Sequence, residues 1–327
     1  MNNAQTQTTE LTRPPHRPRV TLRSTCYNHS AFVEQSFDSV ARQDFTDIQW
    51  IIVDDASTDD SVAKIRGWLG RNQSVLERKG FSIEFYPHTK NRGFVFRLNE
   101  IVARAEGTFL CGLSTDDIMF PWRISLGLAT LDAHDSSFAV SYSDAVVVND
   151  AGRRVTSKLI GKRAPRSGDL FAHMLRHFLI PAPTMMVRLA ALRNVGEYDA
   201  NIAFEDYDMC LRLASQYKFA FCDQPLGKYR LRGGNFHKTI GNADQLLYWM
   251  YRKHIHRSEG RERLRRHYAA MVLRNDLTKK IDADFRQLHL PRPPYFREGI
   301  RQICLQPRKV ARGLWRDESN SAGRRAA

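Results

Sequence analysis

The sequence predicts an α/β protein built on a mostly parallel central sheet. From residue 19 to about residue 133, short apolar runs of strand length alternate with segments whose apolar residues recur at helical spacing. Turn-forming residues separate these segments, and two of the apolar runs lead directly into a pair of aspartates. Strands that alternate with helices in this way pair in parallel through right-handed crossovers.

Four strands and four helices are expected in this first part of the chain. The strands are expected at 19–25, 48–53, 83–86 and 108–113, and the helices at 32–43, 61–69, 95–105 and 122–133. The rest of the main domain should begin with a strand hairpin at 138–148, a polar loop at 153–168 and a short helix at 170–177. Two further strands are expected at 185–187 and 219–222, and an acidic helix between them at 203–214.

Composition divides the chain of 327 residues into three parts. We expect a polar, disordered tail at 1–17, a main domain at 18–240 with halves at 18–120 and 121–240, and a helical extension at 241–327. The extension carries 20 Lys and Arg against 9 Asp and Glu, so it holds most of the net charge of +15. Its helices are expected at 246–256, 263–280 and 296–315.

The basic extension indicates an anionic partner, such as lipid headgroups, a polyanionic acceptor or nucleic acid. The segment 296–315 places apolar residues beside arginines, as interfacial helices do, although Pro307 interrupts it. This segment could dock on an anionic membrane surface or simply form a solvated protein surface, and the sequence leaves both alternatives open. No helix-turn-helix or RNP-like pattern accompanies the charge, so specific nucleic-acid binding is not expected.

Cysteine usage and hydropathy indicate a protein of the cytoplasm. The five cysteines are widely spaced and include no Cys-x-x-Cys pair, which argues against a disulfide framework and against a zinc site. No stretch approaches the ~20 apolar residues of a membrane span, and residues 1–19 lack the apolar core of a secretory signal. We expect a cytoplasmic location, with peripheral attachment at the inner face of the membrane left open.

Asp116 and Asp117 form the first candidate site. They follow the apolar strand expected at 108–113, and Pro121 then suits the first turn of the next helix. Carboxylates at the carboxyl edge of a parallel sheet lie where α/β folds bind ligands, and their hard oxygens suit Mg2+ or Mn2+ that bridges phosphates. The alternative is that the two acids only favour the start of the following helix.

Two other loops favour the ligand site over the helix start. Tyr27-Asn28 and Asp54-Asp55 also follow expected strands. Because the carboxyl ends of parallel strands meet at one edge of a sheet, these loops should converge on Asp116 and Asp117. The sequence therefore predicts a metal and diphosphate site at this edge.

Several segments, taken in order, resemble family 2 glycosyltransferases, which have the GT-A fold. Residues 24–28, 39–45, 53–59 and 91–93 resemble the nucleotide-binding half of that family, and Ser-Thr-Asp-Asp at 114–117 stands where the family keeps its DxD metal motif. Residues 195–199 and 204–213 resemble its Gly-x-Tyr-Asp and Glu-Asp-Tyr-Asp segments. The resemblance covers residues 18–235.

The resemblance implies a role for each matching residue of the nucleotide-binding half. Thr25 and Tyr27 would line the nucleobase pocket, with the Tyr27 ring stacked on a uracil-like base. Asp55 would accept a hydrogen bond from the base or the ribose. Asp116 would touch the ribose or a metal-bound water, and Asp117 would ligate the divalent cation, Mn2+ or Mg2+.

The same resemblance implies that Asp206 is the general base of an inverting displacement, taking the proton of an acceptor hydroxyl. The residues themselves leave an alternative, since Glu205, Asp206 and Asp208 all stand in the first turn of a predicted helix, where acids interact favourably with the dipole. We choose Asp206 as the base and Glu205 as the second candidate, and expect Asp208 to pair with Arg212.

Two arginines depart from the family pattern. Arg23 stands at a strand position that is usually apolar, so its charge must reach solvent, an acid or the substrate. Arg232 replaces a His of the family; a guanidinium cannot ligate a metal but can hold a phosphate through two hydrogen bonds. We therefore expect Arg232 to contact the diphosphate.

The sequence thus predicts an inverting, metal-dependent glycosyltransferase that uses a nucleotide sugar, UDP-linked by preference. The resemblance implies a saccharide or lipid-linked saccharide acceptor, as in bacterial surface polysaccharide or glycoconjugate synthesis. The alternative is a catalytically silent scaffold that binds a nucleotide sugar, and the presence of Asp206 disfavours it.

Overall fold

The structure is a computed structural model that describes residues 19–160, 167–176, 180–202, 204–232, 243–274 and 278–290. The chain divides into two compact units, Met1–Lys238 and Thr239–Ala327, which are described separately. The tail expected at 1–17 and the helix expected at 296–315 lie outside the described residues.

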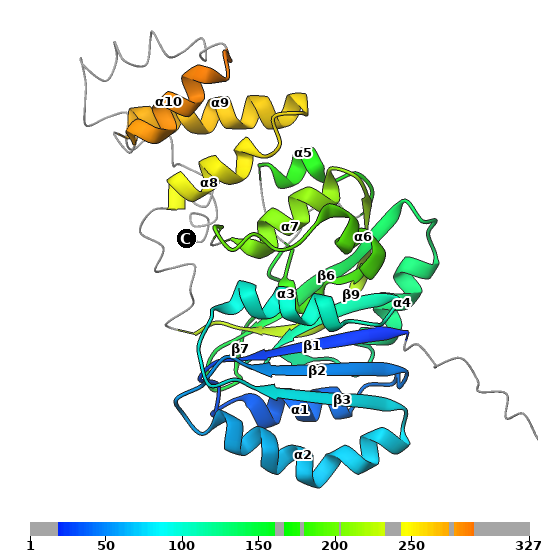
Figure 1. Ribbon diagram of the computed structural model, residues 1–327. Coiled ribbons are helices and arrows are strands. Elements are labelled where there is room, and N and C mark those ends of the chain that lie inside the picture. Colours follow the sequence, from blue (N-terminus) through cyan, green and yellow to red (C-terminus); the bar gives the residue numbers. More distant parts are fainter. Residues whose placement is uncertain are drawn as a thin grey trace, which may run out of the picture. The chain divides into compact units, whose positions relative to one another are not determined.

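One mixed sheet runs through the first unit in the order β3-β2-β1-β4-β8-β6-β9-β5, and β7 pairs with β6 (Figure 1). β1 to β4 pair in parallel, as predicted, whereas β8 runs antiparallel to both β4 and β6. The strands are β1 (Val20–Cys26), β2 (Ile48–Asp54), β3 (Phe81–Pro87), β4 (Phe109–Ser114), β5 (Ile118–Met119), β6 (Phe138–Val148), β7 (Arg154–Thr156), β8 (Met186–Arg188) and β9 (Lys218–Arg230).

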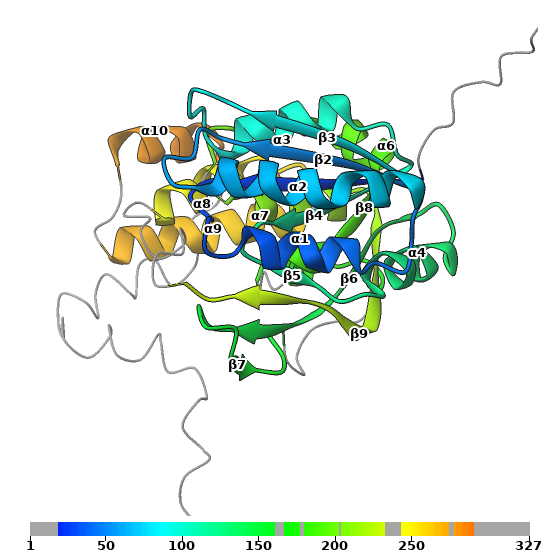
Figure 2. The same ribbon diagram turned by 90° about the horizontal axis from the view of Figure 1, so that it is seen from below.

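Helices cover both faces of the β1–β4 part of the sheet. α1 and α2 lie on one face, and α3, α6 and α7 lie on the other (Figures 1 and 2). The helices of this unit are α1 (Val33–Ala41), α2 (Ser61–Arg78), α3 (Phe94–Arg104), α4 (Arg123–Asp132), α5 (Phe171–Met174), α6 (Leu189–Val195) and α7 (Glu205–Ala214).

Three predicted elements differ from the observed ones. α2 continues to Arg78 because the buried Leu76 extends the apolar face beyond Gly70, which does not end the helix. β9 has 13 residues because it pairs along β6 and then with β5. The loop expected at 153–168 begins with the short strand β7, whose Thr156 pairs with Val147.

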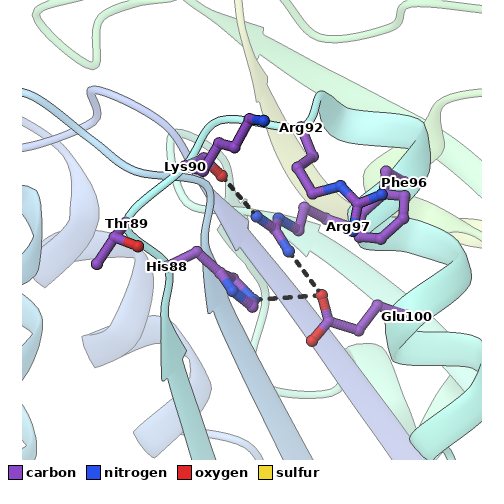
Figure 3. Close-up of a pocket in the computed structure, with 7 residues that line it drawn as sticks. All are labelled: His88, Thr89, Lys90, Arg92, Phe96, Arg97 and Glu100. Atoms are coloured by element: carbon purple, nitrogen blue, oxygen red, sulfur yellow. Dashed lines mark hydrogen bonds and ion pairs between the residues drawn. The ribbon is translucent and has the colours of Figure 1, made fainter.

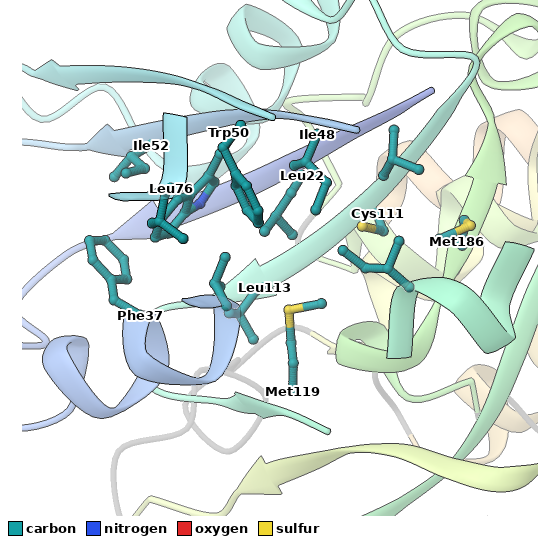
Figure 4. Packing of buried hydrophobic residues seen from close by; sticks show 14 of the residues in the cluster. Leu22, Phe37, Ile48, Trp50, Ile52, Leu76, Cys111, Leu113, Met119 and Met186 are labelled. Carbon is teal, nitrogen blue, oxygen red and sulfur yellow. The ribbon is translucent and has the colours of Figure 1, made fainter. Parts of the chain in front are cut away.

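The core of this unit lies between the sheet and the helices α1 and α2 (Figure 4). Trp50 is fully buried and packs edge-on against Phe37 and Trp68, with ring centroids 4.7 and 5.8 Å away. Its indole N–H donates to the hydroxyl of Ser24 at 2.9 Å, which satisfies its one polar group. This packing fixes β1 and β2, whose ends carry two of the three predicted site loops.

The second unit contains α8 (Ala243–Arg252), α9 (Ser258–Leu273) and α10 (Lys279–Gln287). The single helix expected at 263–280 is wrong, because α10 starts anew after Thr278, whose side chain caps it by accepting from the N–H of Ile281. Tyr268 stacks on Phe285 with ring centroids 3.8 Å apart, which joins α9 to α10. Within the described residues, no helix is both long and apolar enough to cross a bilayer.

Gly107, in the loop before β4, offers a test of how tightly this loop packs on β1. A Cβ atom at Gly107 would lie 2.4 Å from the backbone nitrogen of Thr21 and 2.8 Å from the carbonyl carbon of Val20. We expect Gly107→Ala to lower the free energy of unfolding by about 1–3 kcal/mol, because β1 has to shift.

The matched control is Gly70→Ala, since no atom lies within 4 Å of its Cβ position in α2 and alanine favours a helix over glycine by up to about 1 kcal/mol. Urea unfolding of both variants is the measurement. Equal stability of the two variants would contradict the close approach of this loop to β1.

Candidate nucleotide and metal site

The ends of β1, β2 and β4 meet at one edge of the sheet. Thr25 is buried and pairs in register with Val53 on one side and Ser114 on the other. The N–H of Asp55 donates to the carbonyl of Cys26 at 3.0 Å, and Tyr27, just beyond β1, leaves 46% of its surface exposed. The structure therefore brings Thr25, Tyr27 and Asp55 together, with the Tyr27 ring available for stacking.

Asp55 is held by the loop before α3. Its carboxylate accepts the backbone N–H groups of Arg92 and Gly93 at 2.9 and 2.8 Å. The buried Arg97 donates to it at 2.7 Å. Gly93 has a φ of +90°, a conformation that a residue with a side chain adopts at a cost. Asp55 thus ties this loop to the end of β2, while its predicted contact with a base or ribose stays a prediction.

Arg97 also lines a cavity of about 300 Å3 beside this loop (Figure 3). Its guanidinium donates to Glu100 at 2.9 Å and to the carbonyl of Lys90 at 2.8 Å. Across the cavity, the guanidinium of Arg92 lies 3.5 Å from the centre of the Phe96 ring. The cavity is therefore basic and has an aromatic wall, a combination that suits an anionic or π-rich ligand. Its lining residues are His88, Thr89, Lys90, Arg92, Phe96, Arg97 and Glu100.

Asp117 lies buried in the turn between β4 and β5, with 5% of its surface exposed. One carboxylate oxygen, Oδ1, accepts the backbone N–H of Arg230 at 2.8 Å. The other accepts no hydrogen bond from the residues that the structure describes. Burial raises the pKa of Asp117 well above its usual range, and the charge of Asp116 adds to the rise. A cation beside Asp117 would oppose both effects.

The carboxylate of Asp116 contacts several polar side chains at this edge of the sheet. Its carboxylate accepts the Ser114 hydroxyl at 2.6 Å and lies 3.4 Å from the guanidinium of Arg232. The ring of His29 lies 3.7 Å from the same carboxylate and 2.8 Å from the hydroxyl of Thr115. Burial lowers the pKa of His29, so its ring is neutral at pH 7. Arg232 thus lies beside Asp116, and its predicted contact with the diphosphate stays a prediction.

Two residues of this site were missed from the sequence. Arg230, only 2% exposed, donates its backbone N–H to Asp117 and its side-chain N–H groups to the carbonyl of Asp116 and to Gln35. His29 follows Tyr27-Asn28 directly. Both residues stand inside or beside segments that carry the family resemblance, and position next to a motif is the signal that would have found them.

The donor set fits a divalent cation that is shared with a ligand. Among the residues described, no group of three or more His, Cys, Asp and Glu is placed to hold a metal. Asp117 has an unoccupied carboxylate oxygen, and Asp116 stands next to it with partial exposure. Mg2+ and Mn2+ commonly use one or two carboxylates and take their other ligands from phosphates and water. These two acids suit that arrangement.

Glu205 and Asp206 begin α7, on the face of the sheet that carries α3. Burial raises the pKa of Glu205 to about 8, and the charge of Asp206 adds to the rise. Asp206 accepts the N–H of Tyr207 at 2.7 Å. The predicted pair of Asp208 with Arg212 is confirmed at 2.9 Å. The raised pKa favours the protonated form of Glu205 near neutral pH.

Comparison with known proteins identifies the family. The model of the glycosyl transferase family 2 matches residues 24–194, a segment that runs from the end of β1 past β8 and includes the Asp116–Asp117 turn. The chain belongs to this family. The sequence-based resemblance is therefore confirmed, and the match ends before Glu205 and Arg232.

Relatives and solved structures agree with this family. An uncharacterized glycosyltransferase of Rickettsia felis is 24% identical over 220 residues, which are 67% of this chain and 34% of that protein. The chain thus spans about a third of the length of that relative. An uncharacterized glycosyltransferase of Methanocaldococcus jannaschii is 22% identical over 73% of this chain and 80% of its own length.

Two solved structures confirm the GT-A fold. S. aureus TarS in complex with UDP-GlcNAc has a TM-score of 0.61 at 18% identity, covering 77% of this chain and 72% of that one. The mannosyltransferase PcManGT of Pyrobaculum calidifontis in complex with GDP-Man and Mn2+ has a TM-score of 0.56 at 15% identity, covering 94% and 92%. At these identities the likeness establishes the fold alone.

The Asp55–Arg97 pair is expected to stabilise the fold. Arg97→Leu leaves the buried Asp55 carboxylate without its charged partner, so we expect a loss of about 3–5 kcal/mol in the free energy of unfolding. The matched control is Arg71→Leu, which removes an exposed pair with Glu34 and should cost at most about 1 kcal/mol. Chemical denaturation distinguishes them, and similar losses would contradict this assignment of Arg97.

Glu205 is expected to make stability depend on pH. Its raised pKa means that the folded state binds the proton more tightly than the unfolded state, so stability is full below about pH 4.5 and falls as the pH rises toward 8. We expect Glu205→Gln to match the wild type near pH 5 and to melt several degrees higher near pH 9.

The exposed Glu106, replaced by Gln, provides the control and should leave the difference from wild type constant with pH. Thermal melts across this pH range are the measurement. A Glu205→Gln difference that does not grow with pH would show that this carboxyl is ionised in the folded protein at neutral pH.

Proposed function

We propose that this chain is an inverting, metal-dependent glycosyltransferase that moves a sugar from a nucleotide sugar to an acceptor hydroxyl. The observation that carries the proposal is the group of Asp116, Asp117, Arg230 and Arg232, in which two carboxylates and two guanidinium-bearing residues meet at the ends of β4 and β9. Diphosphate recognition needs this combination of metal-ligating oxygens and cationic donors.

In the proposed donor complex, the Tyr27 ring stacks on the base and the Thr25 and Asp55 loops border it. Arg232 donates to the diphosphate, since its guanidinium reaches Asp116 and is partly exposed. Asp117 and Asp116 would hold Mn2+ or Mg2+, which when bound offsets the negative charge of the departing nucleoside diphosphate. The neutral His29 adds no positive charge. Among the described residues, the guanidinium of Arg232 lies 3.4 Å from the Asp116 carboxylate, and that of Arg230 donates to the Asp116 carbonyl at 2.8 Å.

In the proposed transfer, Asp206 accepts the proton of the acceptor hydroxyl as that oxygen attacks the anomeric carbon. Burial and the charge of Asp206 raise the pKa of Glu205 to about 8, which makes Glu205 the weaker candidate for the base at neutral pH. Contacts of α7 with its neighbours hold both acids in place, because Tyr207 donates to the carbonyl of Met174 at 2.6 Å and Arg212 to that of Val195 at 2.8 Å.

TarS was solved in complex with UDP-GlcNAc, and PcManGT in complex with GDP-Man and Mn2+, which supports a nucleotide sugar and a divalent cation here. We propose UDP as the first nucleotide to test. The acceptor is proposed to be a saccharide or a lipid-linked saccharide of surface polysaccharide or glycoconjugate synthesis, and the basic extension is a candidate surface for an anionic membrane. A catalytically silent nucleotide-sugar scaffold is the alternative.

Calorimetric titration with UDP, GDP and dTDP, each with Mn2+ and with chelator, tests the donor site. We expect one nucleotide to bind only with metal, and Asp117→Ala to weaken it at least tenfold, because the cation loses a carboxylate ligand. Asp60→Ala, an exposed aspartate at the start of α2, should bind as the wild type does.

Donor hydrolysis by wild type and Asp206→Asn then separates enzyme from scaffold. We expect the variant to bind the nucleotide unchanged and to turn over the donor about 100- to 10,000-fold more slowly, as the loss of a general base predicts. No metal-dependent binding of any of the three nucleotides would overturn the transferase proposal. Binding with unaffected turnover in Asp206→Asn would assign the base to another group.

A further inference from the structure

Arg23 lies on β1, and its charge has no ion-pair partner among the described residues. It shares a sheet face with Thr25, two residues and about 7 Å further along the strand. The side chain is partly buried, and it forms no hydrogen bond or ion pair with any of the residues that the structure describes. Its one recorded contact is with the ring of Phe94, whose centre lies 5.9 Å from the guanidinium carbon.

A glycine makes room for this arginine. Gly112 is the residue of β4 that pairs with Arg23 across the sheet. A Cβ atom at Gly112 would lie 2.6 Å from the guanidinium carbon of Arg23 and 2.7 Å from one of its nitrogens. The head group therefore lies over Gly112 of β4, close enough to α7 for its charge to act on Glu205.

No acid among the residues described forms an ion pair or a hydrogen bond with Arg23. Arg123, fully buried, lies close enough for its charge to act on Arg23, and one of its terminal nitrogens has no hydrogen-bond partner within the described chain. The remaining donors of Arg123 bind the carbonyls of Gly112, Pro183 and Met185. Glu205 of α7 lies close enough for the charge of Arg23 to act on it, but the two form no ion pair in the described part of the chain.

Arg23 lies near the proposed substrate site. Phe94 is 42% exposed and follows Gly93, whose N–H holds Asp55 beside the nucleobase loops. Arg23 thus has the nucleotide loops on one side and the two acids of α7 on the other. In the proposed reaction, a sugar held between the nucleotide loops and Asp206 would lie near Arg23. Removing a guanidinium from water without an acceptor is unfavourable, and a bound anion relieves that cost.

We propose that Arg23 binds a carboxylate on the sugar substrate, so that this enzyme acts on an acidic sugar. The inference rests on the proposed function and names the substrate class of the same site. The carboxylate belongs either to the donor sugar or to the acceptor, and the two sources are separated by experiment. A bidentate pair with a carboxylate fits the planar fork of an arginine better than the single charge of a lysine.

The donor arm compares sugars that differ only at C6. Calorimetry on the full chain with Mn2+ measures UDP-glucuronate against UDP-glucose and GDP-mannuronate against GDP-mannose. For the nucleotide that binds, we expect the acidic sugar to bind about 10- to 100-fold more tightly, the range of a charged hydrogen-bonded pair. Arg23→Met should abolish this preference and leave affinity for the free nucleoside diphosphate unchanged; Arg23→Lys should restore part of it.

The acceptor arm applies when the donor pair shows no preference. Product formation with methyl glucuronide is compared with methyl glucoside, and we expect the uronide to be preferred tenfold or more in kcat/KM, with the preference lost in Arg23→Met. Gly112→Ala is the second variant: it keeps the charge but places a methyl group against the guanidinium, and it should reduce the same preference.

The outcomes separate this inference from the function on which it rests. Nucleotide binding that depends on Asp117, without an acidic preference in either arm, would overturn the role of Arg23 and leave the transferase proposal standing. An acidic preference that survives Arg23→Met would place the carboxylate elsewhere and overturn it as well. Failure of every nucleotide to bind would overturn both.

Discussion

The hydrogen bond from the backbone N–H of Arg230 to the carboxylate of Asp117 connects residues 113 positions apart in the chain. It places the end of β9 against the turn that follows β4, and the side chain of Arg230 then binds the carbonyls of Asp116, Asn149 and Asp150. One buried arginine therefore sets the distance between the first half of the sheet, which carries the nucleotide loops, and the second half. The position of Arg232 beside Asp116 follows from this arrangement, since it lies two residues beyond Arg230.

Burial of charge recurs in this unit, and each instance has a different consequence. Asp55 and Arg97 neutralise one another and fix a loop. Asp117 has one backbone donor and a raised pKa, so its ionised form is favoured only when a cation or a similar charge is near. Buried ion pairs serve structure, whereas a buried acid with an unoccupied oxygen is poised to bind. A structural buried acid and a ligand-binding one are distinguished by how many hydrogen-bond and ion-pair partners the carboxylate has.

Much of the fold was predictable from the sequence because the decisive signals are local. The apolar runs of β1, β2 and β4 and the helical spacing of α1 and α3 depend on neighbours within a few residues. The long β9 was not predictable, because its residues are held by pairing with β6 and β5, partners that are distant in the chain. The break between α9 and α10 depended on one cap, Thr278, inside a continuous helical pattern.

In the candidate site, too, some residues are predictable from local sequence patterns and others only from long-range contacts. Asp116, Asp117 and Asp55 could be predicted as candidate site residues because acids after buried strands are a local pattern, whereas the contacts of Arg230 and Arg97 depend on residues distant in the chain. Arg23 is the reverse case: its sequence position is anomalous, yet only Gly112 on the neighbouring strand explains how the strand accommodates it. A charge on an inner strand with a glycine opposite, and with no acid bound to it in the described chain, is a feature that stability alone does not favour. Such a feature is best explained by a ligand that brings the missing charge.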